Sequence, residues 1–280
     1  MTESSRRPGD TGPGGGAGLA GKAGRATVLA LLAGTVGGAA VLAGEALLAR
    51  SRRYAQPEFG LALRSTVGRP GAPPLRLVLL GDSAALGVGV DRVDDTIGGQ
   101  LARLLAEGGR PGGTERQVRL SSVGVAGSRS TDLATQVARA LLGERPDVAV
   151  ILVGANDATG LRRPAEAAEH LGMAVRRLRE ARVEVVVGTC PDLGAVRAIA
   201  PPLRQLAGWY GRRTARAQTA AVLSAGGAVV DLGAEAGPVF RADAGTLCYD
   251  GYHPSADGYR VWAHALLPAV VNAATVASQR

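Results

Sequence analysis

Short apolar runs rich in valine and leucine alternate with longer helical patterns through most of this chain. Such an alternation is typical of parallel strands joined by helices, and with buried strands it predicts a three-layer α/β/α sandwich around a five-stranded parallel sheet. We expect strands at residues 75–80, 118–123, 148–153, 183–188 and 228–232, and helices at 96–106, 131–142, 164–181, 202–225 and 256–271.

The composition is consistent with one catalytic-size domain, which we expect over residues 75–280. Hydrophobic residues make up 46% of the 280 and aromatic residues only 3%, so Ala, Val and Leu must fill the core. The net charge is +8, but the arginines are scattered over the chain and are not interleaved with stacking aromatics. We therefore expect no nucleic-acid partner.

The residues before the domain divide into three segments. Residues 1–25 are rich in Gly, Ser and Pro with four basic side chains, and we expect disorder there. Residues 26–44 carry no charge and are long enough to approach the span of a bilayer core, which predicts a membrane anchor. We expect residues 45–74 to be a linker. We expect an extracytoplasmic domain held at the membrane, or a secreted one if the apolar segment is a signal peptide cleaved near Ala43.

Polar residues follow the ends of predicted strands. Ser83 comes directly after the first strand, Gly127 after the second, and Asn156 after the third, while Asp250 and His253 precede the last helix. In open parallel sheets the ligand site lies beyond the carboxyl ends of the strands, near the point where the strand order reverses. We therefore expect these side chains to meet at one edge of the sheet.

These stretches resemble those of the SGNH hydrolases, also called the GDSL family, over roughly residues 75–270. The resemblance implies a flavodoxin-like fold and a serine esterase. It implies that Ser83 is the nucleophile, that Asp250 and His253 complete the triad, and that Gly127 and Asn156 complete the oxyanion hole. The chain has Ser121 and Ser122 where the family often has Asn, so Gly124 competes with Gly127 for that role.

The chemistry of these residue types supports the same interpretation. A serine hydroxyl needs an imidazole to take its proton, and the imidazole needs a carboxylate to fix its tautomer. Asp82 and Asp157 are expected to bond to local backbone, Asp157 at the turn around Asn156. His170 and His264 are expected to be ordinary helix residues, and with the two cysteines they match no zinc spacing, so we expect neither a metal nor a cofactor.

The sequence thus predicts hydrolysis of a small-molecule or lipid carboxylic ester through an acyl-enzyme. An acyltransferase using the same serine, and a membrane-tethered binding protein without turnover, are the alternatives. We expect loops at residues 84–95, 190–204 and 233–249 to line a pocket for a modest acyl chain. Cys190 follows the predicted strand at residues 183–188, and Cys248 lies just before Asp250. Both cysteines should therefore lie near the same end of the sheet, which suggests a disulfide if the domain lies outside the cytoplasm.

Overall fold

A computed structural model of the protein describes residues 38–49, 51–58, 63–109 and 113–280. The chain divides into two units, residues 1–48 and 49–280, of which the second contains the whole sheet. Within the first unit the described part is most of a short apolar helix, Gly38–Ala49. Most of the predicted anchor, residues 26–37, lies outside the described residues, so the anchor stays a prediction that carbonate extraction of membranes can test.

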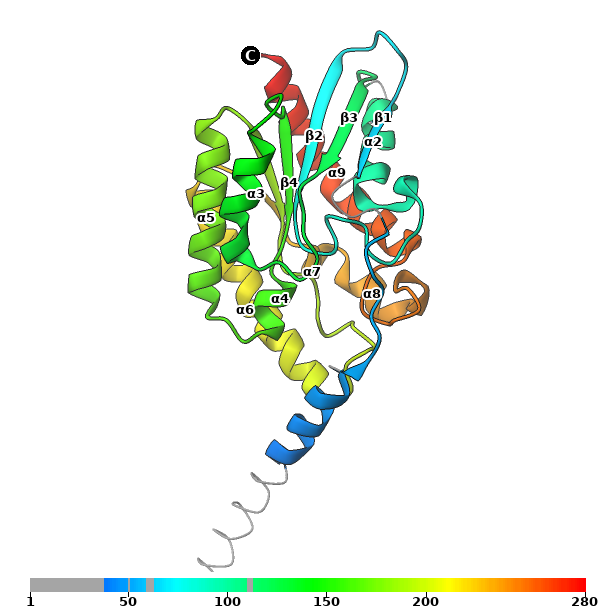
Figure 1. Ribbon diagram of the computed structural model, residues 1–280, viewed down its shortest axis with the longest axis vertical. Coiled ribbons are helices and arrows are strands. Elements are labelled where there is room, and N and C mark those ends of the chain that lie inside the picture. Colours follow the sequence, from blue (N-terminus) through cyan, green and yellow to red (C-terminus); the bar gives the residue numbers. More distant parts are fainter. Residues whose placement is uncertain (1–37, 50, 59–62, 110–112) are drawn as a thin grey trace, which may run out of the picture. The chain divides into compact units, whose positions relative to one another are not determined.

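The sheet has the strand order β1-β3-β2-β4-β5-β6 (Figure 1). Five strands are parallel neighbours in the order expected for a flavodoxin-like sheet, which confirms the predicted α/β class. Their bounds are β2 Pro74–Gly81, β3 Gln117–Ser122, β4 Val148–Leu152, β5 Glu184–Gly188 and β6 Ala228–Val230.

The predicted number of strands, five, is wrong because a sixth strand lies at the edge of the sheet. β1 (Arg64–Val67) pairs antiparallel with β3, and it falls in the segment that we expected to be a linker. An edge strand has only one neighbour, and its side chains here alternate between exposed and half-buried. Its four residues therefore lack the continuous apolar run that marks the central strands.

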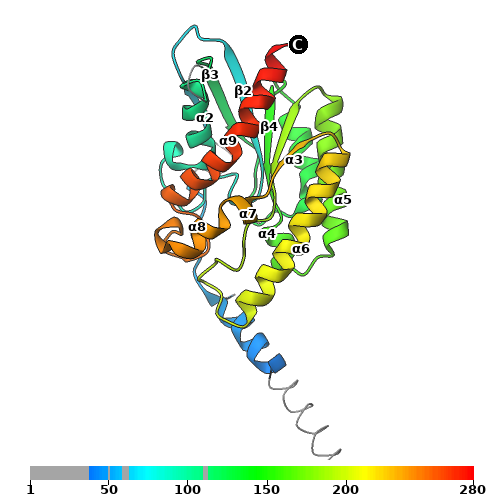
Figure 2. The same cartoon turned by 180° about the vertical axis from the view of Figure 1, so that it is seen from behind.

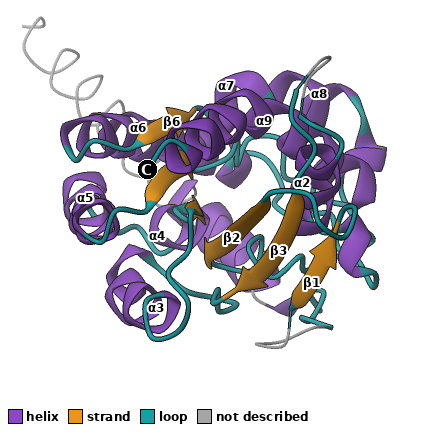
Figure 3. Cartoon of the chain, turned by 90° about the horizontal axis from the view of Figure 1, so that it is seen from above, coloured by secondary structure: helices purple, strands orange, loops and turns teal. Residues whose placement is uncertain are grey.

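Helices cover both faces of the sheet, as Figures 2 and 3 show. Alternate strand residues point to opposite faces: Leu77 and Leu79 of β2 pack with one apolar cluster, and Val78 and Leu80 with the other. The first cluster includes residues of α2 (Ile97–Ala106) and α9 (Ala256–Ser278); the second includes residues of α3 (Leu133–Ala140), α5 (Pro164–Glu180) and α6 (Leu203–Ser224).

The long last helix, α9, ends at Ser278 and not near Val271 as the sequence suggested.

Shorter helices lie at or near the carboxyl ends of the strands. The three-residue 3-10 segments are η2 Val93–Asp95, η3 Ser130–Asp132 and η4 Ala244–Thr246, and the short α-helices are α4 Ala155–Thr159, α7 Leu232–Glu235 and α8 Gly237–Ala242.

Helix α9 is the one helix among the described residues that is long and apolar enough to cross a membrane. Its buried side chains, including Tyr259, Trp262 and Leu266, belong to the apolar cluster on one face of the sheet. A helix buried in a protein core and a helix that spans a membrane can have the same length and apolar composition. The length and composition of α9 are therefore weak support for membrane association.

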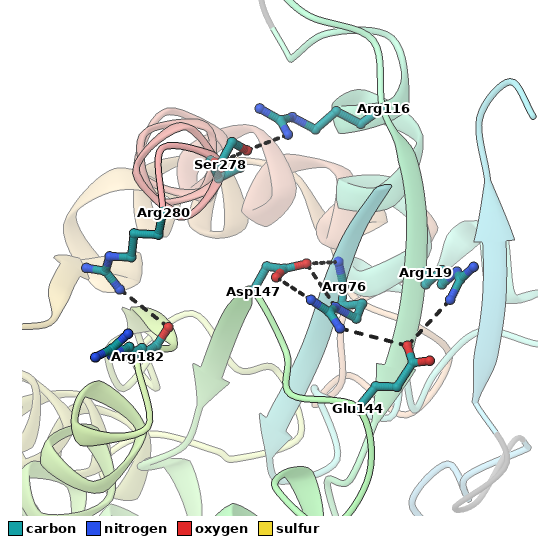
Figure 4. A network of polar contacts seen from close by, with 9 residues as sticks. Arg76, Arg116, Arg119, Glu144, Asp147, Arg182, Ser278 and Arg280 are labelled. Carbon is teal, nitrogen blue, oxygen red and sulfur yellow. Dashed lines mark hydrogen bonds and ion pairs between the residues drawn. The ribbon is translucent and has the colours of Figure 1, made fainter. Parts of the chain in front are cut away.

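The amino ends of the strands are joined by a polar network (Figure 4). Asp147, just before β4, accepts hydrogen bonds from the backbone amide of Arg76 at 2.8 Å and from its guanidinium at 2.9 and 3.2 Å. Glu144 lies between Arg76 and Arg119. The bidentate geometry fixes the start of β2 against β4. This network lies at the amino ends of the strands, whereas Ser83 follows the carboxyl end of β2.

Candidate active site

Ser83 lies in the turn that follows β2, where the local backbone requires glycine. Gly81 has a φ of +131°, and a Cβ there would lie 1.8 Å from the carbonyl oxygen of Leu152 on β4. Only glycine permits both this conformation and this close approach. The backbone of Gly81 therefore packs directly against Leu152, and Ser83, two residues further on, is half-buried. Ser83 does not cap a helix, since α2 begins at Ile97 with Thr96 as its cap.

Ser83, His253 and Asp250 form a continuous hydrogen-bonded chain. The Ser83 Oγ lies 3.1 Å from the Nε2 of His253. The other ring nitrogen of His253, Nδ1, lies 2.6 Å from Oδ2 of Asp250. Asp250 and His253 are both buried, and the turn between them brings residues three apart into contact. With Nδ1 donating to the carboxylate, Nε2 is free to accept the serine proton.

The Asp250 carboxylate is fully hydrogen-bonded. Its Oδ1 accepts from the amides of Tyr252 at 2.7 Å and His253 at 2.9 Å and from the Sγ of Cys248 at 3.1 Å. Its Oδ2 also accepts from the amide of Ala55 at 2.9 Å. Burial raises the pKa of Asp250, but the hydrogen bonds from His253, Ala55 and Tyr252 together outweigh burial and hold the pKa well below its usual range. The carboxylate is therefore charged at neutral pH.

The two cysteines are free thiols, so the disulfide suggested by the sequence is wrong. Cys190 is buried in an apolar cluster with Leu193 and Ala215, whereas Cys248 packs against a different cluster that includes Leu86. Burial raises the pKa of the Cys248 thiol to about 11, so it keeps its proton and donates to Asp250.

Three hydrogen-bond donors are candidates for an oxyanion hole near Ser83. The amides of Ser83 and Gly127 donate to no group within the described residues. Gly127 has a φ of +80°, which allows the loop after β3 to turn at this point. Asn156 Nδ2 donates one proton to the carbonyl of Ser128 at 3.0 Å and has a second proton to give.

The competing glycine, Gly124, is less suited to bind an oxyanion. Its amide already donates to the Oγ of Ser122 at 3.2 Å, and a Cβ at this position would lie 2.8 Å from the Cβ of Ala85. Gly124 is thus a packing glycine whose amide is occupied. The contrast favours Gly127, the glycine predicted for this role, over Gly124.

Gln136 is a buried residue of α3 that sequence reasoning missed. Its Oε1 accepts from the amide of Gly81 at 2.7 Å, and its Nε2 donates to the carbonyl of Gly81 at 2.9 Å and to the Oγ of Ser128 at 3.1 Å. One side chain thereby joins the strand end that carries Ser83 to the loop that contacts Asn156. Its polar character and its helical position gave no sign of this role in the sequence.

Asp157 was expected to order the turn around Asn156, but it contacts a different loop. Its carboxylate accepts from the amide of Ser130 at 3.0 Å and from the Ser130 hydroxyl at 2.9 Å. Burial raises the pKa of Asp157. The contact fixes the loop after β3, with Gly127 on it, against α4.

Asp82 bonds to local backbone, as the sequence predicted, through the amide of Ala84 at 3.0 Å. Burial raises its pKa to about 6, and the Ala84 hydrogen bond only partly offsets this. The folded state therefore binds this proton more tightly than the unfolded state, so ionisation of Asp82 lowers stability as pH rises from about 4 to 6.

Replacing Asp82 with asparagine should remove this pH-dependent loss. Relative to the wild type, we expect Asp82→Asn to gain up to roughly 3 kcal/mol of unfolding free energy between pH 4 and pH 7. Urea denaturation of both proteins at several pH values measures the difference. A difference that stays constant over this pH range would contradict the prediction.

A pocket opens beside Ser83, His253 and Asn156 and continues between apolar side chains. Residues from all three predicted loop segments line it, among them Ala84, Leu193 and Leu247. Phe240 of α8 and Trp262 of α9 also line it, and their ring centroids lie 5.7 Å apart. Among the described residues, no group of three His, Cys, Asp or Glu side chains is placed to hold a metal ion.

Similarity to known proteins extends over most of the domain that contains this site. The GDSL-like lipase/acylhydrolase family matches residues 79–261. The GDSL-like esterase Rv1075c of Mycobacterium tuberculosis is 44% identical over 203 residues, which cover 72% of this chain and 63% of that protein. The match thus spans less than two thirds of the relative.

Solved structures share the fold at lower identity. The lipase/acylhydrolase from Enterococcus faecalis is 22% identical with a TM-score of 0.54, covering 71% of this chain and 96% of its own. LAE5, an alpha/beta hydrolase enzyme from the metagenome of Lake Arreo, is 21% identical with a TM-score of 0.55, covering 72% and 97%. The family match extends over well more than half of the sequence and includes Ser83, Gly127, Asn156, Asp250 and His253. The chain belongs to the GDSL-like lipase/acylhydrolase family.

Proposed function

We propose that this protein is a carboxylic ester hydrolase that uses Ser83 as its nucleophile. The single observation that carries the proposal is the chain of hydrogen bonds from Ser83 Oγ through His253 to Asp250. Ser83 and His253 line an apolar pocket, and Asn156, one of the candidate oxyanion donors, lines it as well. Membership of the family supports the same reaction class.

The reaction begins when the substrate carbonyl carbon lies beside Ser83 Oγ. The oxygen attacks the carbon while its proton passes to Nε2 of His253, and the charge on the imidazolium is balanced by Asp250. The negative charge that develops on the carbonyl oxygen accepts hydrogen bonds from the amides of Ser83 and Gly127 and from Nδ2 of Asn156. Nε2 then gives its proton to the leaving alcohol, and the carbon–oxygen ester bond breaks.

The second half of the reaction repeats these roles with water. His253 takes a proton from a water molecule, whose oxygen attacks the acyl carbon bound to Ser83. The tetrahedral intermediate collapses, the proton returns to Ser83 Oγ, and the carboxylic acid leaves. Apart from the ester and the water molecule, each role is filled by a group of the chain itself.

We propose that the acyl part of the ester occupies the apolar pocket. Phe240 and Trp262, both 6% exposed, line the pocket together with the buried Leu232 and Leu247. An acyl chain that enters between these side chains moves from water to apolar surroundings, which is favourable. Each methylene that fits contributes about 0.8 kcal/mol. An unbranched acyl chain of several carbons therefore suits the pocket better than an acetyl group.

A panel of esters with acyl chains from two to twelve carbons tests both proposals. In the wild type we expect kcat/KM to rise by about fourfold for each added CH₂ until the pocket is full, and then to fall. Phe240→Leu shortens a side chain of the lining and should move the maximum to a longer chain.

Val239→Ala provides the matched control, since Val239 neighbours Phe240 on α8 but its side chain is 42% exposed. This variant should keep the wild-type profile. A maximum at the acetyl ester would contradict the acyl-pocket proposal and leave the esterase proposal standing. Folded wild-type protein that cleaves none of the esters would contradict the esterase proposal itself.

A further inference from the structure

A segment far from the catalytic turn in sequence contacts the acid of the proposed triad. Ala55 is separated from Asp250 by 195 positions, yet its backbone amide donates to Oδ2 of Asp250 at 2.9 Å. It lies outside residues 79–261, which the family match covers. The contact is therefore a feature of this chain beyond the part that defines the family.

The side chains around this contact fix the segment in place. Ala55 is 7% exposed and packs with Leu86 and Val88, which belong to the turn that follows Ser83. The ring of Tyr54 lies edge-on to Tyr252 at 5.4 Å and to His253 at 6.4 Å between centroids. Tyr54 Oη donates to the carbonyl of Ala49 at 2.7 Å, which anchors the ring at its far end.

The position of the hydrogen bond gives it an influence on the imidazole. Oδ2 of Asp250 is the oxygen that also accepts from Nδ1 of His253. With two donors on one carboxylate oxygen, rotation of the carboxylate away from Nδ1 would also weaken the hydrogen bond to Ala55, so the second donor opposes that rotation. The Ala55 amide thereby restrains the oxygen that sets the tautomer and orientation of His253.

We propose that the backbone amide of Ala55 is a positioning group for the acid–base pair, and that residues 54–55 form part of the active-site scaffold. The inference rests on the proposed function, because it gives His253 and Asp250 their catalytic roles. Residues 54–55, which precede the first strand of the sheet, then contribute to the rate of catalysis. Residues 54–55 are then more than a connection to the N-terminal unit.

Removing the N–H tests the proposal. Ala55→Pro removes it, whereas Ala55→Ser keeps it and is the matched control. A hydrogen bond to a charged group is strong enough that we expect kcat to fall about 10- to 100-fold in Ala55→Pro, with KM within about twofold of the wild type. Ala55→Ser should keep both constants near their wild-type values.

Proline also restricts the backbone, so a second substitution isolates the N–H. L-Lactic acid in place of Ala55 converts the amide to an ester and keeps the methyl side chain. If Ala55→Pro does not fold, the lactate protein provides the measurement, and its kcat should fall in the same range. An unchanged kcat in folded lactate protein would overturn the inference.

A double-mutant cycle with Asp250→Ala separates positioning from a purely structural role. If the amide acts through the carboxylate, its removal should change kcat by less than about twofold once Asp250 is absent. An equal fall in both backgrounds would mean that the segment acts through the fold, and would overturn the inference. Wild-type protein that is folded but inactive toward every ester would instead contradict the proposed function, so the two failures are distinguishable.

Discussion

Replacement of Ser83 with alanine is expected to reduce ester turnover to near background, by roughly 10⁴-fold or more. In the proposed mechanism the Oγ atom of Ser83 forms the acyl-enzyme, and no second hydroxyl is hydrogen-bonded to His253 in the described part of the chain. His253→Ala removes the proposed base and should cause a loss of similar size. The double variant should cost little more than either change, because the two residues act as a unit.

Steady-state kinetics on purified, folded variants measures these losses. His170→Ala and His264→Ala are controls of the same chemistry, and both side chains lie in helices away from the pocket. They should stay near wild type. Asp250→Ala should fall between the wild type and His253→Ala, since backbone contacts still partly orient the ring. Substantial activity in Ser83→Ala would refute the nucleophile assignment.

The sequence predicted the central fold and the main candidates because both depend on local patterns. Strands β2, β4 and β5 are short apolar runs, and they are buried enough to exclude charged residues from most positions. Ser83 and Asn156 follow two of these runs directly, so placing the strands also placed the side chains. Asp250 and His253 are three residues apart, and a single turn suffices to join them.

The missed features depend on contacts between distant segments. The hydrogen bonds of Gln136 with Gly81 and of Ala55 with Asp250 join residues 55 and 195 positions apart. A backbone amide is present at nearly every residue, so the sequence cannot single out the one at Ala55. Strand β1 was missed for a related reason, since its four residues gain order from pairing with β3 and not from their own apolar pattern.

Asn156 is expected to contribute in the transition state and not in substrate binding. Its Nδ2 group donates one proton to Ser128, and this bond fixes the amide so that the second proton has a defined direction. A donor that is already oriented loses little entropy when charge develops on the carbonyl oxygen. The ground-state carbonyl, with less charge, gains little from the same bond.

Asn156→Ala should therefore lower kcat by about 10²–10³-fold and leave KM almost unchanged. Asn156→Asp keeps the size of the side chain but replaces the donor with a negative charge, so its kcat should fall further than that of the alanine variant. Asn272→Ala, at an exposed position on α9, is the control and should match the wild type. A large rise in KM with unchanged kcat would assign Asn156 to substrate binding, and the oxyanion hole would then consist of the Ser83 and Gly127 amides alone.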